Sequence, residues 1–189
     1  MKNKIFDPNK LNKLNNTHRL KEIPPEFIWK NLNLKNPKIL VDIGAGTGFI
    51  TKEFIKLLGD GKIYAFDISN IMVEWMKNNL CNEYPNIYPK VIFNDSLPMK
   101  DKIADLVYMI TLHHEIENHE KLLKESHRVL KVGGKIFIVD WKKKETTGGP
   151  PISIRFQEEV VAEQLAEAGF QNIEIINELQ NHFYIFGEK

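Results

Sequence analysis

Strand-like and helix-like segments alternate along this chain from Lys38 to residue 168, and this alternation limits what it can fold into. Parallel strands need a long crossover between them, and a helix of about ten residues supplies one. The expected strands are residues 38–43, 62–67, 90–94, 105–110 and 135–140, and the expected helices are residues 49–58, 71–80, 121–130 and 158–168. Because such crossovers are right-handed, the pattern predicts a doubly wound α/β fold around a parallel sheet.

The last part of the chain departs from this alternation. Two strand-like runs, residues 172–177 and 182–186, are separated only by residues 178–181, which are too few for a crossover helix. The two runs should therefore pair as an antiparallel hairpin. The full expectation is a Rossmann-like, seven-stranded, mostly parallel sheet that ends in an antiparallel C-terminal hairpin.

The chain length of 189 residues suits a single domain with a sizeable core. Residues 1–37 differ from the rest because they are rich in Asn and Lys, and apolar residues gather only after Pro24 and Pro25. These two prolines are well placed to start a helix. We therefore expect an N-terminal helical appendage or lid over residues 1–37 and the α/β domain over residues 38–189.

Charge and cysteine content argue against several classes of partner. Lys and Arg total 26 and Asp and Glu total 25, so the net charge of +1 gives no overall field that recruits nucleic acid or an acidic membrane. We find neither the apolar core of a secretory signal nor the ~20 apolar residues of a membrane helix. Cys81 is the only cysteine, which excludes an internal disulfide. We expect a cytoplasmic monomer or homodimer with a small-molecule substrate and no membrane insertion.

The residues Ile39 to Gly48 read I-L-V-D-I-G-A-G-T-G. A short apolar strand that breaks into glycines leaves backbone N–H groups open to a ligand at the start of the next helix. The dinucleotide fingerprint G-x-G-x-x-G would need its third glycine at position 49, where this chain has Phe49. Here the spacing is G-x-G-x-G. Other nucleotide folds, or a purely structural turn, remain open at this point.

With Asp42 two residues before the first glycine, this stretch resembles motif I of the class I S-adenosylmethionine-dependent methyltransferases. The resemblance is nearest to the type 11 branch that includes ubiquinone/menaquinone biosynthesis enzymes, and it extends from Ile39 to Asp140. The motifs that carry it are V-D-I-G-A-G-T-G, A-F-D-I-S, N-D-S-L-P, D-L-V-Y-M-I-T-L-H-H and L-L-K-E-S-H-R-V-L-K-V-G-G-K-I-F-I-V-D-W. The resemblance implies S-adenosyl-L-methionine as cofactor and methyl transfer to a small molecule.

The resemblance also implies which residues would hold the cofactor. Asp67 ends the second strand, where a carboxylate can accept two hydrogen bonds from a ribose diol, and Asp42 would face the ammonium end. Each position also has an ordinary structural interpretation, such as a strand-end cap or helix packing. The predicted cofactor-binding residues are Asp42, Gly44, Ala45, Gly46, Gly48, Asp67, Ile68, Met72, Asp95, Ser96, Leu97 and Thr111.

Methyl transfer from a sulfonium is an in-line displacement that needs alignment and exclusion of water, and it requires no metal. If the acceptor must lose a proton, His113 and His114 at the end of the fourth strand are candidate general bases. Alternatively, this turn supplies only backbone carbonyls and packing. The zinc motif H-E-x-x-H would need histidine where the chain has Asn118, so we expect no metal site.

Two other functions stay open on the sequence. A nicotinamide-dependent oxidoreductase is disfavoured by the glycine spacing and the terminal hairpin, and a non-catalytic S-adenosylmethionine-binding module would keep the glycine loop without an acceptor pocket. Methylation of nucleic-acid amino groups would require an (N/D)-P-P-(Y/F) signature after the fourth strand. This chain has T-L-H-H there, so we expect no nucleic-acid substrate.

Overall fold

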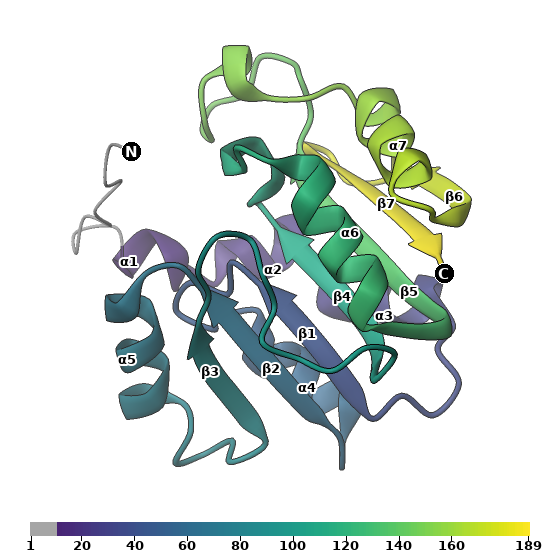
Figure 1. The fold of residues 1–189 in the computed structure, drawn as a ribbon. Coiled ribbons are helices and arrows are strands. Elements are labelled where there is room, and N and C mark those ends of the chain that lie inside the picture. Colours follow the sequence, from purple (N-terminus) through teal and green to yellow (C-terminus); the bar gives the residue numbers. More distant parts are fainter. Residues whose placement is uncertain (1–10) are drawn as a thin grey trace.

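A seven-stranded sheet forms the centre of the molecule (Figure 1), with strand order β3-β2-β1-β4-β5-β7-β6. This computed structural model describes residues 11–189, so residues 1–10 of the expected appendage lie outside it. The strands are β1 (Ile39–Ile43), β2 (Lys62–Asp67), β3 (Ile87–Val91), β4 (Ala104–Ile110), β5 (Leu130–Trp141), β6 (Gln171–Ile176) and β7 (His182–Glu188).

The pairing confirms the predicted fold class. Strands β3, β2, β1, β4 and β5 are all parallel neighbours, whereas β7 runs antiparallel to both β5 and β6. Strand β1 has β2 on one side and β4 on the other, so the strand order reverses at β1. Ligands of open α/β sheets bind beyond the carboxyl ends of the strands at such a reversal.

Helices cover both faces of the sheet and bury two apolar cores. One core joins the sheet to α3, α4 and α5, and the other joins it to α6 and α7. In Figure 1, α6 lies in front of β4 and β5, whereas α3 and α4 lie behind the sheet. The helices are α1 (Leu11–Leu14), α2 (His18–Glu22), α3 (Pro25–Leu32), α4 (Thr51–Leu58), α5 (Asn70–Asn79), α6 (His119–Val129) and α7 (Glu158–Glu167).

The third strand differs from the prediction. Strand β3 covers Ile87–Val91 and contains Pro89, whereas we expected a strand over residues 90–94. Proline has no N–H for a ladder hydrogen bond, but an edge strand tolerates it, and β3 is an edge strand. The chain turns just beyond, since Asn94 and Asp95 both have a φ of +53°.

The predicted proline-started helix is present and belongs to the core. Pro25 occupies the first turn of α3, and Ile28 and Leu32 are fully buried. Lys135 Nζ donates a hydrogen bond of 2.9 Å to the Leu32 carbonyl and so ties the end of α3 to β5. The appendage from Pro25 onward is therefore part of the packed domain.

Asp105 joins the starts of three segments. Its Oδ2 accepts hydrogen bonds from the backbone N–H groups of Lys38 and Ile39 at 2.8 and 2.9 Å, and its Oδ1 lies 2.5 Å from Lys131 Nζ. This one carboxylate therefore holds the start of β1 against the starts of β4 and β5.

Asp105→Ala should lower the free energy of unfolding by about 2–4 kcal/mol, because it leaves two backbone donors and an ammonium group without their acceptor. Asp60→Ala is the matched control, since the Asp60 carboxylate also contacts Lys38, at 2.7 Å, but is exposed. Such surface pairs contribute little, so the control should match the wild type. Urea unfolding measures both, and equal losses in the two variants would contradict the role given to Asp105.

Candidate functional site

The glycine loop follows β1 and is held by the end of β2. The N–H groups of Gly44 and Ala45 donate to the Phe66 carbonyl at 2.8 and 3.0 Å, and the Gly46 N–H donates to Asp67 Oδ2 at 2.8 Å. Gly44, Gly46 and Gly48 have φ values of +73°, +58° and +71°, which favour glycine. A Cβ on Gly48 would lie only 2.4 Å from Leu80 Cδ1. The loop therefore needs glycine for its conformation and its close packing.

Asp67 links this loop to the next helix. Its Oδ1 accepts a hydrogen bond from the Ser69 N–H at 2.8 Å, while its Oδ2 holds Gly46. Burial raises the pKa of Asp67 above its ordinary value, and the two backbone N–H groups act in the opposite sense. A carboxylate has about four lone-pair positions, so two of them stay free for a ligand.

Two exposed apolar side chains lie near Asp67 at the carboxyl ends of β2 and β3. Ile68 is 72% exposed and Phe93 is 73% exposed. The Ile92 N–H donates to the Asp67 carbonyl at 3.0 Å, so the residues that follow β2 and β3 leave the sheet side by side. The sequence prediction missed Phe93, although it directly precedes the N-D-S segment that the prediction used.

The other predicted cofactor residues lie at different depths. Met72 and Leu97 are each only 2% exposed, so their side chains pack in the core beneath the predicted cofactor site. Asp95 and Ser96 lie in the turn after β3, and Thr111 directly follows β4 with a φ of +53°. The structure therefore gathers these residues at the carboxyl ends of β1 to β4.

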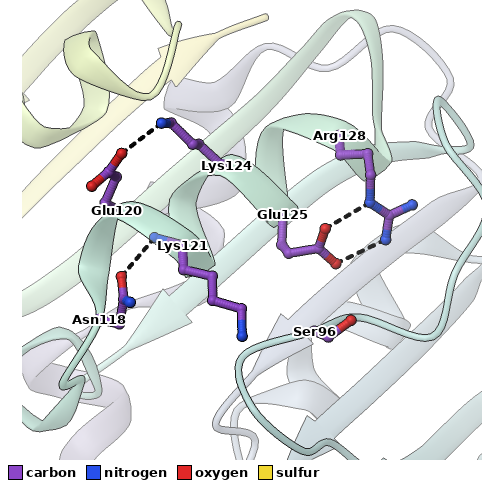
Figure 2. Close-up of a pocket in the computed structure, with 7 residues that line it drawn as sticks. All are labelled: Ser96, Asn118, Glu120, Lys121, Lys124, Glu125 and Arg128. Carbon is purple, nitrogen blue, oxygen red and sulfur yellow. Dashed lines mark hydrogen bonds and ion pairs between the residues drawn. The ribbon is translucent and has the colours of Figure 1, made fainter.

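A shallow polar groove of about 540 Å³ separates the turn after β3 from α6 (Figure 2). The Glu125 carboxylate accepts from the Leu97 N–H at 2.9 Å and pairs with Arg128, which also donates to the Leu97 and Met99 carbonyls. Lys121 Nζ donates to the Asn94 carbonyl. Lys121, Glu125 and Arg128 of α6 thus fix residues 94–99 in place. The residues that line the groove are Ser96, Asn118, Glu120, Lys121, Lys124, Glu125 and Arg128.

Asp42 lies beneath the glycine loop. Its carboxylate is buried and accepts a hydrogen bond of 2.6 Å from the Thr51 hydroxyl in the first turn of α4. Burial raises the pKa of Asp42 to about 7, the Asp67 charge also raises it, and the charge of Arg19 lowers it. Asp42 therefore ties β1 to α4 through Thr51, and the positive charge of Arg19 on α2 acts on its carboxylate.

Residues 11–22 lie across the glycine loop. The Thr47 hydroxyl donates to Asn15 Oδ1 at 2.9 Å, and a Cβ on Gly46 would lie 3.7 Å from Leu14 Cδ1. Arg19 donates to the Leu14 carbonyl at 2.7 Å, which fixes α2 relative to α1. Figure 1 shows α1 and α2 at the end of the sheet to which the arrowheads of β1 and β2 point. The segment thus lies against the glycine loop at the carboxyl end of β1.

The two candidate bases lie in different environments in the short helix His113–Glu115. His113 is buried, its Nε2 lies 2.7 Å from Gln164 Oε1, and its ring packs against those of His119 and Phe156. Burial lowers the pKa of His113 to about 4, so it is neutral near pH 7. His114 instead lies with its Nδ1 2.8 Å from Asp140 Oδ1.

Comparison with known proteins assigns the family. The family model for a methyltransferase domain matches residues 41–138, which is more than half of the chain. The chain belongs to this methyltransferase family. Its cofactor is S-adenosyl-L-methionine, as the resemblance in the motifs implies.

Solved structures and curated proteins agree with this assignment. The methyltransferase is 30% identical to a S-adenosylmethionine-dependent methyltransferase from Aquifex aeolicus, with a TM-score of 0.88 over 96% of this chain and 98% of that one. It is 32% identical over 124 residues to the ubiquinone/menaquinone biosynthesis C-methyltransferase UbiE of Hydrogenovibrio crunogenus. The matched region covers 61% of this chain and 49% of that relative. The chain spans about half the length of the curated relatives it matches.

The residues of the methyltransferase fit this cofactor. The glycine loop and α4 present a helix N-terminus, Asp67 keeps free acceptor positions, and Ile68 and Phe93 offer an apolar edge for a flat ring. Among residues 11–189 there is no group of three His, Cys, Asp or Glu side chains that could hold a metal ion. No helix in that range is long and apolar enough to cross a membrane.

Arg155 fixes the loop after β5. All five of its N–H donors bind backbone carbonyls, at 2.7 to 3.1 Å, and its guanidinium lies over the Trp141 ring. The accepting residues are Lys142, Lys144, Gly148 and Pro150. Because every donor is used, Arg155 shapes the loop and has no N–H left for a substrate anion.

His182 is a buried polar group that the sequence prediction missed. It is 1% exposed, it packs on its cross-strand neighbour Trp141, and neither ring nitrogen has a hydrogen-bond partner within the described part of the chain. Burial lowers the pKa of His182 to about 4, and the charges of Glu22 and Asp140 raise it in part. His182 therefore stays neutral in the folded methyltransferase at pH 7.

The free energy of unfolding of the methyltransferase should decrease as the pH is lowered, because His182 is held neutral in the folded state. The unfolded chain binds a proton at this residue below about pH 6.5, whereas the folded chain does so only near pH 4. Between about pH 7.5 and pH 5, the wild type should lose roughly 1–2 kcal/mol more unfolding free energy than His182→Gln.

Urea unfolding at both pH values measures this difference. His18→Gln, which changes an exposed histidine, is the control and should keep the wild-type pH dependence. Parallel pH profiles for wild type and His182→Gln would show that His182 is not held neutral.

Proposed function

We propose that this chain is an S-adenosylmethionine-dependent methyltransferase that acts on a small-molecule acceptor. The observation that carries the proposal is the hydrogen bond between Asp67 Oδ2 and the Gly46 N–H, at the point where the strand order reverses. This bond joins the two motifs that would hold the ends of one nucleoside ligand. Ligands of this sheet architecture bind at that point.

Each part of the donor would meet a residue of matching chemistry. The Asp67 carboxylate would accept from the ribose hydroxyls, and Ile68 and Phe93 would pack on the adenine ring, with Asp95 and Ser96 near its amino group. The first turn of α4 carries a partial positive charge suited to a carboxylate. When bound, the cofactor supplies a methyl group already activated on a sulfonium. The protein then has to align the acceptor and exclude water.

Of the appendage expected over residues 1–37, the part that would act as a lid on this site is residues 11–22, because α3 is packed into the core. Residues 11–22 already contact the loop through Asn15 and Leu14, and the Arg19 charge acts on Asp42. The ammonium group of the cofactor would bring a second positive charge to the same region. We infer that α1 and α2 shift when the cofactor enters and then close over it.

The proposal includes a cytoplasmic monomer or homodimer with a diffusible acceptor. The nearly balanced charge of 26 basic and 25 acidic residues supports a small partner over nucleic acid. The curated relatives are named for ubiquinone/menaquinone biosynthesis, so quinone precursors are one class of acceptor to test. The chain matches only about half the length of those proteins, so their acceptor does not transfer directly to it.

Isothermal titration calorimetry with S-adenosylhomocysteine and with NAD tests the proposal. The wild type should bind S-adenosylhomocysteine, and Asp67→Asn should weaken that binding by about 10- to 100-fold, because the amide cannot accept from both ribose hydroxyls. Asp60→Asn, on an exposed side chain before the start of β2, should bind like the wild type.

Binding of NAD alone would reject the proposal in favour of an oxidoreductase. Turnover separates an enzyme from a non-catalytic binding module: formation of S-adenosylhomocysteine with any acceptor of a metabolite panel supports the enzyme. Equal affinities of wild type and Asp67→Asn would show that the ligand does not use this carboxylate.

A further inference from the structure

His114 and Asp140 form a buried pair at the carboxyl ends of β4 and β5. The imidazole Nδ1 lies 2.8 Å from Asp140 Oδ1, and the exposed fractions of the two side chains are 6% and 4%. Asp140 Oδ2 also accepts from the His114 backbone N–H at 3.1 Å. The carboxylate thus holds both the backbone and the ring of one histidine.

The hydrogen bonds of Asp140 fix which nitrogen of His114 carries the proton. Asp140 Oδ1 accepts from the Trp141 N–H at 2.7 Å as well as from the ring, so the carboxylate acts only as an acceptor. His114 must then donate from Nδ1, which leaves the lone pair on Nε2. This is the protonation state of a base that is ready to take a proton.

The turn that carries His114 contacts the glycine loop. Leu112, two residues before His114, packs on Gly44 so closely that a Cβ on that glycine would lie 2.7 Å from its methyl carbons. The Nε2 atom of His114 lies 3.8 Å from the carboxylate of Glu115, which is 53% exposed. A proton on Nε2 therefore has a route to solvent past Glu115.

His113 does not share these properties. Its Nε2 lies 2.7 Å from Gln164 Oε1, and Phe156 packs on its ring. Both contacts fix His113 between the turn and α7. Of the two adjacent histidines, His114 alone is paired with a carboxylate and borders an exposed group.

We propose that His114 is the general base of the methyl transfer, that Asp140 is its positioning residue, and that the acceptor is therefore a group that loses a proton. This inference rests on the proposed function. The acceptor would be a hydroxyl, a thiol, an N–H or an activated C–H, and acceptors without a proton to lose, such as tertiary amines and thioethers, would not depend on the pair.

The step balances in atoms and charge. The acceptor atom forms a bond to the methyl carbon as the methyl–sulfur bond breaks, and the electron pair of that bond stays on sulfur. The acceptor proton moves to Nε2 of His114. The resulting imidazolium is stabilised by Asp140 and then passes the proton to water beside Glu115.

The first test reads the proton position without catalysis. In the full chain labelled with ¹⁵N, the imidazole spectrum should show His114 with its proton on Nδ1 and a bare Nε2, with the signals assigned by their loss in His114→Asn. Asp140→Asn should move the proton to Nε2, because the amide can donate to Nδ1. A proton on Nε2 in the wild type would overturn the proposal.

The second test compares turnover with catechol and 2-mercaptoethanol against trimethylamine and dimethyl sulfide. His114→Asn should lower kcat for the first two by about 10²- to 10⁴-fold and remove the acidic limb of the pH profile. Asp140→Asn should lower kcat and shift that limb, and Asp140→Glu should restore part of it. The charged and titratable neighbours of His114 in this profile are Asp140 on β5 and Glu115 and His113 in the turn.

Binding of S-adenosylhomocysteine separates this inference from the function it rests on. His114→Asn and Asp140→Asn should both bind it, which also shows that they fold, whereas failure of the wild type to bind would reject the methyltransferase itself. His127→Gln, near the end of α6, is the control and should keep wild-type turnover. If His114→Asn also kept the wild-type kcat and pH profile, His114 would not be the base.

Discussion

The structure of the site depends on one buried carboxylate. Asp67 accepts an N–H from Gly46 with one oxygen and an N–H from Ser69 with the other, each at 2.8 Å. The first bond sets the shape of the glycine loop, and the second holds Ser69 at the start of α5. Met76 of α5 and Leu80, which directly follows that helix, pack against Gly48. Leaving these N–H groups unpaired would cost about 1–3 kcal/mol each, so the loop and the helix are coupled through this side chain.

The residues that we propose for the cofactor and for the acceptor lie on different strands of the sheet. The residues suited to the cofactor follow β1, β2 and β3, and they are held from outside by residues 11–22 and by α6 through Glu125. The pair proposed to act on the acceptor consists of His114, in the turn after β4, and Asp140, near the end of β5. The turn that begins at Thr111 joins the two halves, because Leu112 packs on Gly44 and His114 meets Asp140. A methyl group held at the reversal of strand order would lie between them.

Sequence patterns predicted the parallel sheet, the terminal hairpin and the place of Asp67, because these follow from segment length and from spacing along the chain. The third strand was predicted three residues late, since Pro89 reads as a strand breaker until the strand is known to lie at an edge. The environments of His113 and His114 could not be predicted, because neighbouring residues with identical side chains meet Gln164 and Asp140 only after folding. The roles of Phe93, Arg155 and His182 likewise depend on strand pairing and loop closure, which local sequence does not specify.

The most direct test of this account is a crystal structure with S-adenosylhomocysteine. The account predicts that the ribose hydroxyls bind the Asp67 carboxylate while it keeps its bond to the Gly46 N–H, and that the adenine ring packs on Ile68 and Phe93. A structure with the ligand bound elsewhere, or with Asp67 bonded only to backbone N–H groups, would contradict it.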